Sequence, residues 1–352
     1  MNRKINALCA CSLLMPALLL TSCGFIDDDL DDCYIDMQAD YELRLVTNEN
    51  LELARTLSDR PGIADALHQH LSGVFTDNGR DLDLSFYLNN VRQHQQTEDM
   101  NSASTKHVNM QLPIEDYTHL AIANLQGNNV LALQNGDSYN QAAIKLPTGD
   151  ATIASQKSGI FTGRHAFTNM VRGIHTYHMP LYIANSAAAI VLDPRTCKYT
   201  DIKVFTSGFA TAFNVADSTY FYDNSPMVLS DKVNLPDTTK WIAYCGVSYP
   251  SREPSSNARS LNYTTRSVTQ TDQPFLYADC GENIWQYETY VTMTDGTTTK
   301  TTLSIRHPLR AGQLKIIVGF IDDQGVVRLY DTDLGESVDV KWEKGSVYPI
   351  II

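Results

Sequence analysis

Cys23 is the residue whose type and surroundings predict a definite chemistry. It ends the stretch Leu20-Thr21-Ser22-Cys23, in which a branched aliphatic residue and two small residues precede a cysteine. This order is that of a bacterial lipobox. Small residues let a signal peptidase reach the bond between Ser22 and Cys23, and the thiol is needed because the lipid is attached to it as a thioether. The sequence therefore predicts cleavage after Ser22 and lipidation of Cys23; the alternative is an ordinary signal peptide followed by an unrelated cysteine.

The segment before Cys23 favours secretion. Arg3 and Lys4 give a basic start, and the run from Ile5 to Leu20 is almost entirely apolar, as in a signal peptide. The run is shorter than the ~20 residues that a transmembrane helix needs, and Pro16 interrupts it. We expect residues 1–22 to be a signal peptide and residues 23–32 a lipidated, acidic tether. Several acyl chains, at ~0.8 kcal/mol per buried methylene, would hold the chain at the outer membrane.

Four more cysteines follow, at positions 33, 197, 245 and 280. An even number in an exported protein permits two disulfides in three possible pairings. Buried free thiols are the alternative. If one bridge forms, Cys245 and Cys280 are the candidate pair because they lie nearest to one another in the sequence.

Side chains for catalysis or metal binding do not form a recognisable set. Nucleotide-binding, nucleophile-elbow and zinc-protease motifs do not occur in the sequence. His165, His175 and His178 are close in sequence, but no cysteine or carboxylate completes a zinc ligand set at a usual spacing. We therefore expect no enzyme, no metal site and no cofactor. The 18 Tyr and 3 Trp residues leave open a sugar-stacking surface, although aromatic residues on strands usually pack in the core.

Charge and length limit the partners and the architecture. The chain has 27 basic and 40 acidic residues, a net charge of −13, and removal of residues 1–22, with two basic and no acidic residues, makes it −15. Because nucleic-acid binding depends on neutralising phosphates, no nucleic-acid partner is expected. The 330 residues left from the 352-residue chain are too many for one ordinary core and suit two domains.

Hydrophobic alternation predicts that both domains are built of strands. Residues 33–45 alternate, with Cys33, Ile35, Met37, Ala39, Tyr41, Leu43 and Leu45 on one face. Apolar residues at helical spacing after Pro61 predict one short helix, and Gln126–Gly159 is expected to form long loops with short elements. A second series of strands starts near Tyr177, with a hairpin turn at Asp295-Gly296. The sequence predicts an all-β protein with an N-terminal β-sandwich over residues 33–172, a C-terminal β-sandwich over 173–352, and a hinge between 169 and 177.

Several weak motifs together resemble a known family. Asp29-Leu-Asp-Asp-Cys33 leads into the first predicted strand, Val74-Phe-Thr-Asp77 ends the predicted helix, and His178-Met-Pro-Leu-Tyr182 opens the second series. With the lipobox, this arrangement resembles the FimB-like fimbrial anchor and minor-subunit lipoproteins of Bacteroidales. The resemblance implies two transthyretin-like β-sandwich domains and no catalysis. It also implies a lipid-anchored place on the cell surface, at the base of a fimbrium whose length the protein limits.

The resemblance implies other fimbrial subunits as partners, and a host or bacterial surface ligand is compatible with it. The end of the chain is the candidate contact strand: Val347, Tyr348, Ile350, Ile351 and Ile352 are apolar, although termini are usually polar unless tied down. One interpretation is pairing within the chain's own second sheet. The other is donation to a neighbouring subunit, since related fimbriae join subunits by exchanged strands. The rival function is glycan binding through aromatic residues on a β-sandwich.

Overall fold

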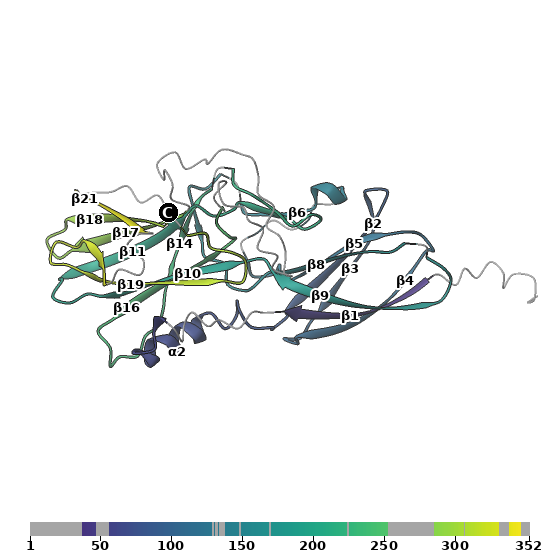
Figure 1. Cartoon of the computed structure of the whole chain (residues 1–352), viewed down its shortest axis with the longest axis horizontal. Helices are drawn as coiled ribbons and strands as arrows, with labels where there is room; N and C mark the ends of the chain where they lie inside the picture. The colour runs from purple at the N-terminus through teal and green to yellow at the C-terminus, as the bar shows by residue number, and fades with distance from the viewer. Residues whose placement is uncertain are drawn as a thin grey trace, which may run out of the picture.

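The computed structural model describes residues 37–46, 56–128, 130, 133, 138–147, 149–168, 170–223, 225–252, 285–305, 307–330 and 338–345, the last as backbone only. They form an all-β, multi-domain fold with a single α-helix in this part of the chain. The molecule is elongated, with one large sheet at one end and a pair of facing sheets at the other (Figure 1). No helix in the described ranges is long and apolar enough to cross a membrane.

The first sheet has seven strands in the order β3-β2-β5-β8-β9-β1-β4. Its strands are β1 (Met37–Val46), β2 (Asp81–Leu88), β3 (Val91–Asp99), β4 (Thr105–Leu112), β5 (Thr118–Ala123), β8 (Phe161–Ala166) and β9 (Ile174–Ile183).

Alternation along β1 builds the core of the first sheet. Met37, Ala39, Tyr41, Leu43 and Leu45 are each at most 2% exposed, as the pattern predicted. The sheet curls so that β1 faces β2: the Tyr41 ring lies 6.1 Å from the ring of Phe86. Burying a large apolar side chain contributes ~1.5–3 kcal/mol, so these two facing layers form a stable core.

Strand β9 lies at the predicted boundary between the two halves. It begins at Ile174 and pairs in parallel with β1 from Gln38↔Ile174 to Val46↔Tyr182, so it belongs to the first sheet. The predicted hinge at 169–177 overlaps the start of this strand, and the first sheet extends past residue 172. The division into two folding domains stays a prediction.

The second half contains two facing sheets around their own core. The five-stranded sheet has the order β15 (Asp231–Lys232), β16 (Ile242–Ser248), β10 (Ser186–Asp193), β19 (Leu314–Ile321), β20 (Val327–Leu329). The six-stranded sheet has the order β21 (Val338–Gly345), β18 (Thr298–Ile305), β17 (Trp285–Met293), β11 (Tyr199–Ser207), β14 (Met227–Leu229), β7 (Thr152–Ala154). Trp285, Tyr287 and Ile190 are fully buried between them.

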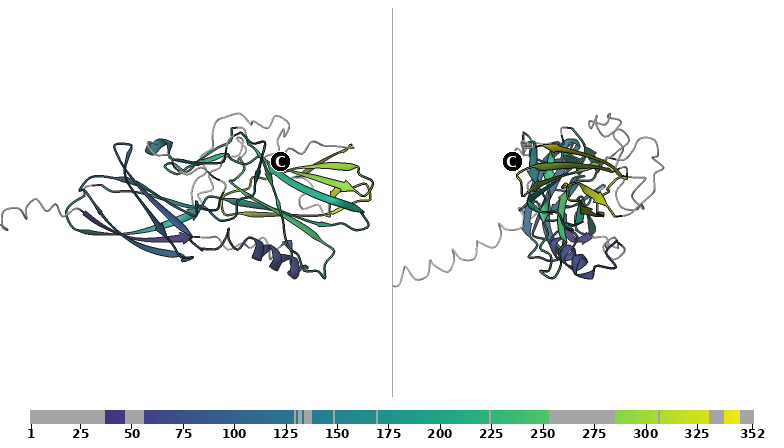
Figure 2. Two further views of the ribbon diagram at one scale, coloured as in Figure 1. Left: turned by 180° about the vertical axis from the view of Figure 1, so that it is seen from behind. Right: turned by 90° about the vertical axis from the view of Figure 1, so that its left-hand side faces the viewer.

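The predicted helix is α2 (Pro61–His70), and it lies against the second half of the molecule. Its buried residues Ile63 and Leu67 belong to the same apolar cluster as Ala187 and Val191 of β10. Alternate residues of β10 face the core of the sheet pair, so this strand is buried on both faces. Figures 1 and 2 show the helix beside the strands of the five-stranded sheet. A helix that precedes most of the first sheet in sequence thus covers the second half.

The Asn- and Gly-rich insert also joins the two halves. It was expected to form long loops with short elements, and it contains η1 (Tyr139–Gln141), β6 (Ala143–Lys145) and β7. β6 pairs with β12 (Ala212–Asn214), which pairs with β13 (Thr219–Phe221), to give a small three-stranded sheet. β7 pairs in parallel with β14. The insert is therefore part of the sheet framework of the second half.

Candidate functional site

The small sheet has one buried face and one open face. Ile144 of β6, Phe213 of β12 and Tyr220 of β13 point into an apolar cluster that also contains Leu120 and Ile122 of β5. Because successive side chains on a strand point to opposite faces, the residues on either side of these three form the open face. The core thus fixes which side chains the small sheet presents outward.

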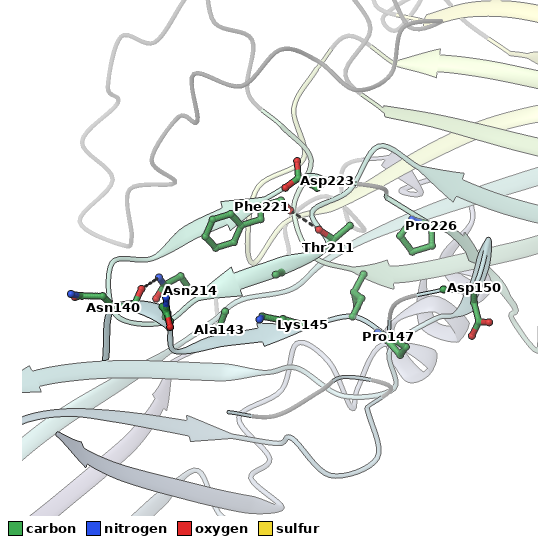
Figure 3. Close-up of a pocket in the computed structure, with 14 residues that line it drawn as sticks. Asn140, Ala143, Lys145, Pro147, Asp150, Thr211, Asn214, Phe221, Asp223 and Pro226 are labelled. Carbon is green, nitrogen blue, oxygen red and sulfur yellow. Dashed lines mark hydrogen bonds between the residues drawn. The ribbon is translucent and has the colours of Figure 1, made fainter. Parts of the chain in front are cut away.

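Side-chain size makes the open face concave. Ala212 is paired with Lys145 on one side and Phe221 on the other, and Ala143 is paired with Asn214. Ala143 lies between longer side chains at the floor of the groove (Figure 3). The groove has a volume of about 690 Å³, and its walls are Asn140, Gln141, Leu146, Pro147, Gly149, Asp150, Thr211, Asp223 and Pro226.

Hydrogen bonds hold the shape of this groove. The Asn214 side chain is 4% exposed; its Nδ2 donates to the Asn140 carbonyl oxygen over 2.8 Å, and its Oδ1 accepts from the Ala216 N–H over 2.9 Å. The Thr211 hydroxyl donates to the Phe221 carbonyl oxygen over 3.2 Å. These bonds fix the ends of β12 and β13, so the groove is formed before any ligand arrives.

The groove presents one aromatic ring among charged and amide groups. Phe221 is 39% exposed, and Lys145, Asp150 and Asp223 are exposed as well. Volumes of ~300–1,000 Å³ are typical of small-molecule sites. The arrangement suits the binding of a polar ligand of a few rings.

The other exposed aromatic ring of the described chain does not form a stacking platform. Tyr330 is 39% exposed, and its ring lies 5.8 Å from that of Trp241 at an angle of 38°. The Arg195 guanidinium covers the Phe320 ring at 3.2 Å, and Arg60 lies over Trp241 at 4.6 Å. These tilted, arginine-covered rings join neighbouring elements and leave no flat face for a sugar.

Several predicted site residues lie outside the described residues. They are Ser22 and Cys23 of the cleavage and lipidation site, Cys280, and the contact residues Val347, Tyr348, Ile350, Ile351 and Ile352. Their roles stay predictions.

Cys245 is the predicted disulfide partner that the structure does describe. It lies on β16 and is completely buried, and burial raises the pKa of its thiol well above the ordinary value. Among the described residues, neither it nor the buried Cys197 is bonded to another cysteine. Because Cys280 is outside the described residues, the pairing of Cys245 with Cys280 stays a prediction.

The strand that leads to the predicted contact segment lies at a sheet edge. β21 is antiparallel to β18 over its whole length, from Thr298↔Gly345 to Ile305↔Val338. Within the described ranges no strand pairs with its other side. An edge strand presents a row of backbone N–H and C=O groups to any strand that approaches, so this edge is a second candidate contact site.

Two of the histidines considered in the sequence have separate polar partners. His175 Nε2 is 2.8 Å from the Val171 carbonyl oxygen, and His178 Nδ1 is 2.7 Å from a Glu42 carboxylate oxygen. Among the described residues, no three His, Cys, Asp or Glu side chains gather as metal ligands.

Comparison with known proteins gives similar structures but no family assignment. No protein-family model matches the chain, and no curated protein does. A candidate adhesin from Bacteroides ovatus is 10% identical with a TM-score of 0.49, over 87% of this chain and 96% of that one. The fimbrial anchor protein Mfa2 from Porphyromonas gingivalis is 10% identical with a TM-score of 0.40, over 60% and 73% of the two chains. The tip fimbrial protein Mfa3 from the same organism is 9% identical with a TM-score of 0.37, over 88% and 99%. At these identities and scores, the likeness does not assign a function to this chain.

Proposed function

We propose that the chain is a lipid-anchored subunit of a fimbrium, on the surface of the outer membrane, that ties the filament to the membrane. The observation that carries this proposal is that the strand after the predicted lipid site and the strand before the candidate contact segment lie toward opposite ends of the molecule. β1, the first described strand after the predicted lipid site, begins at one end, and β21 lies in the half at the other end (Figure 1). An anchor needs its membrane attachment and its filament contact at opposite ends.

The backbone of β21 gives the filament contact a physical basis. Its free side can accept a further strand, and such pairing draws affinity from backbone hydrogen bonds and register from alternate side chains. The apolar residues Val347–Ile352 come directly after it in the chain. We propose that this segment is donated to the neighbouring subunit; pairing within the six-stranded sheet is the alternative. A growing filament would end at this subunit, which would also limit its length.

Removal of Val347–Ile352 tests strand donation. The truncated protein is expected to fold, to carry lipid and to reach the surface, because strand donation would place these residues in the neighbouring subunit and not in the chain's own core. It should fail to retain filaments, which would then appear in the culture medium. Fatty-acid labelling, surface proteolysis and the amount of shed filament are the measurements.

A matched control separates backbone pairing from apolar packing. Replacing Val347, Ile350, Ile351 and Ile352 by Thr keeps the strand propensity and the backbone, so filament retention should be weakened less than by deletion. A truncated protein that unfolds, or one that retains filaments as the wild type does, would show that donation by this segment is wrong.

Glycan binding is the second candidate function, and the groove on the small sheet is the observation that favours it. An exposed aromatic ring can stack on the apolar face of a sugar while amides and carboxylates bind its hydroxyls. Phe221→Ala should then lower affinity for a glycan found by array screening about 5- to 150-fold, if losing the ring costs ~1–3 kcal/mol, as it does for a ring stacked on a nucleic-acid base. Tyr330→Ala removes an equally exposed ring elsewhere and is the control. If the wild type binds no glycan, or if the Phe221 variant binds it with the same affinity, the groove is not a glycan-binding site.

A further inference from the structure

Three large apolar side chains are exposed at the end of the molecule where β1 begins. Ile114 is 41% exposed, Val171 61% and Ile174 67%, and they are half of the six exposed large hydrophobic residues in the described chain. Single exposed apolar residues are common, but a group from different loops at one end of a molecule points to a contact surface. We call this group, Ile114 with Val171 and Ile174, the apolar tip.

Backbone contacts bring these residues to the same end. Ile114 follows β4, whose Leu112 is paired with Met37 at the start of β1. Val171 lies in the β8–β9 connection, and Ile174 is the first residue of β9. The two loops are joined because the Met170 N–H donates to an Asp116 carboxylate oxygen over 3.2 Å. The Gln38 N–H donates to the Gly173 carbonyl oxygen over 3.0 Å, which ties the second loop to β1.

Aromatic side chains pack together at the base of the loop that contains Val171. The Phe167 and Tyr177 rings on either side of it lie 4.4 Å apart, and the Tyr177 hydroxyl is 3.7 Å from the Met170 sulfur. The apolar side chains therefore stand on a rigid base. Their exposure is a property of the fold and not of a loosely packed loop.

We infer that the apolar tip rests on the lipid surface, with its side chains in the interfacial layer of the membrane. This inference rests on the proposed lipid anchor at Cys23. Met37 is fourteen positions after Cys23, and an extended chain spans at most ~3.3–3.6 Å per residue, so the lipid lies within about 50 Å of Met37. The apolar tip surrounds the point where that segment joins the fold, which makes it the part of the described molecule that the tether brings to the membrane.

Charge and free energy indicate how such a contact works. Arg172 adds one positive charge, Glu115 and Asp116 add two negative ones, and His175 is engaged with the Val171 carbonyl oxygen, so headgroup charge does not drive the contact. Partial burial of three apolar side chains stabilises the contact in proportion to the small apolar area that is removed from water. This stabilisation is too little to bind a membrane alone. It is enough to orient a protein that a lipid already holds at a high local concentration.

A fluorescent probe at Ile174 tests the contact. The Ile174→Cys variant of the full lipidated protein is labelled with an environment-sensitive dye and placed on phosphatidylcholine vesicles. Its emission should increase and shift to shorter wavelength relative to the same protein in detergent-free buffer. The matched control is Thr294→Cys, an exposed position at the turn after β17 in the far half, whose emission should not change. Wild type labelled in parallel corrects for native thiols.

A second variant and a separate readout keep the outcomes distinct. Val171→Ser with Ile174→Ser should leave vesicle flotation unchanged, because the lipid still binds, but should make the β8–β9 loop accessible to protease on the vesicle surface. If the protein floats and the probe still reports water, the membrane contact is wrong while the lipid anchor stands. If the labelled protein shifts equally in vesicle-free solution on self-association, the apolar tip contacts a second copy and the inference is overturned. If the wild type does not float with the vesicles, both the proposed lipid anchor and the membrane contact that rests on it are wrong.

Discussion

At the scale of single residues, His119 stands out because a titratable side chain is fully buried among aromatic rings. It is fully buried on β5, its ring stacks 5.1 Å from Phe86 and 5.0 Å from Phe167, and its Nε2 lies 3.4 Å from the Tyr41 hydroxyl. Its Nδ1 has no hydrogen-bond partner in the described protein. Burial, together with the neighbouring His165, lowers the pKa of His119 to about 3. The imidazole therefore acts as a neutral aromatic core residue.

The lowered pKa predicts a loss of stability in acid. Between pH 6.5 and about 3 the unfolded chain binds a proton at this histidine and the folded chain does not, so the free energy of unfolding falls as the pH falls. The contribution is ~1.4 kcal/mol per pH unit in that window. His119→Phe keeps the stacking and removes the titration, so its stability should depend less steeply on pH. Chemical denaturation at several pH values gives the free energy of unfolding of both proteins, and the variant His107→Gln at an exposed position is the control. Identical slopes for the wild type and the Phe variant would contradict this account.

The position of His119 in the alternating pattern of its strand is the sequence feature that indicates this burial. In the segment Tyr117–Ala123, which contains β5, Tyr117, Ala121 and Ala123 lie on the same face as His119. Alternation alone thus puts the histidine inside. The residue type works against that conclusion, because histidine is more often exposed, and only the surrounding aromatic rings show why burial is tolerated.

At the scale of elements, α2 is the piece whose existence was predicted and whose position was not. Helical spacing and Pro61 indicated the helix, but nothing in its sequence names the surface that it covers. The surface that the helix covers includes β10, in which every residue of Ser186–Leu192 is buried. A strand that is apolar on both faces needs a covering layer on each side. That requirement can be read from the sequence, but the element that meets it cannot.

Truncation of the helix contact should destabilise the second half as well as the helix. Leu67 is fully buried on α2, and Leu67→Ala should lower the free energy of unfolding by about 2–5 kcal/mol. Amide hydrogen exchange should then become faster in β10 and β16 of the five-stranded sheet. His68→Ala on the exposed side of the same helix is the matched control and should change neither quantity. If faster exchange stays confined to α2, the helix does not support that sheet.

The groove on the small sheet shows where sequence reasoning stops at this scale. β6 and β12 are three residues each and lie far apart in the chain, so no window of the sequence contains the groove. The short alternations of Ala143-Ile144-Lys145 and Ala212-Phe213-Asn214 fit strands only once their pairing is known. The exposed Phe221 had no pattern to set it apart from the many aromatic residues of the core.

At the scale of the whole molecule, the all-β class and the single helix were predictable because alternation and turn residues are local signals. The joining of the two halves was not, since it depends on long-range pairing: β7 with β14, β6 with β12, and α2 with the five-stranded sheet. The same joins explain why the predicted boundary near residue 172 does not coincide with the limits of a sheet. The two ends of the molecule are fixed relative to one another by three separate segments.

The parallel pairing of β1 with β9 has a mechanical consequence for a protein tethered at one end. A pull on the N-terminal side of β1 acts at the apolar tip, and the opposing load reaches β9 through its C-terminal end, where the chain enters the second half. The two forces act along the strands and in opposite directions. Nine consecutive residue pairs, from Gln38↔Ile174 to Val46↔Tyr182, therefore carry the load together in shear instead of separating one by one. If the chain is anchored as proposed, this pairing makes the tethered end of the molecule resist force along the direction in which a filament under flow would pull.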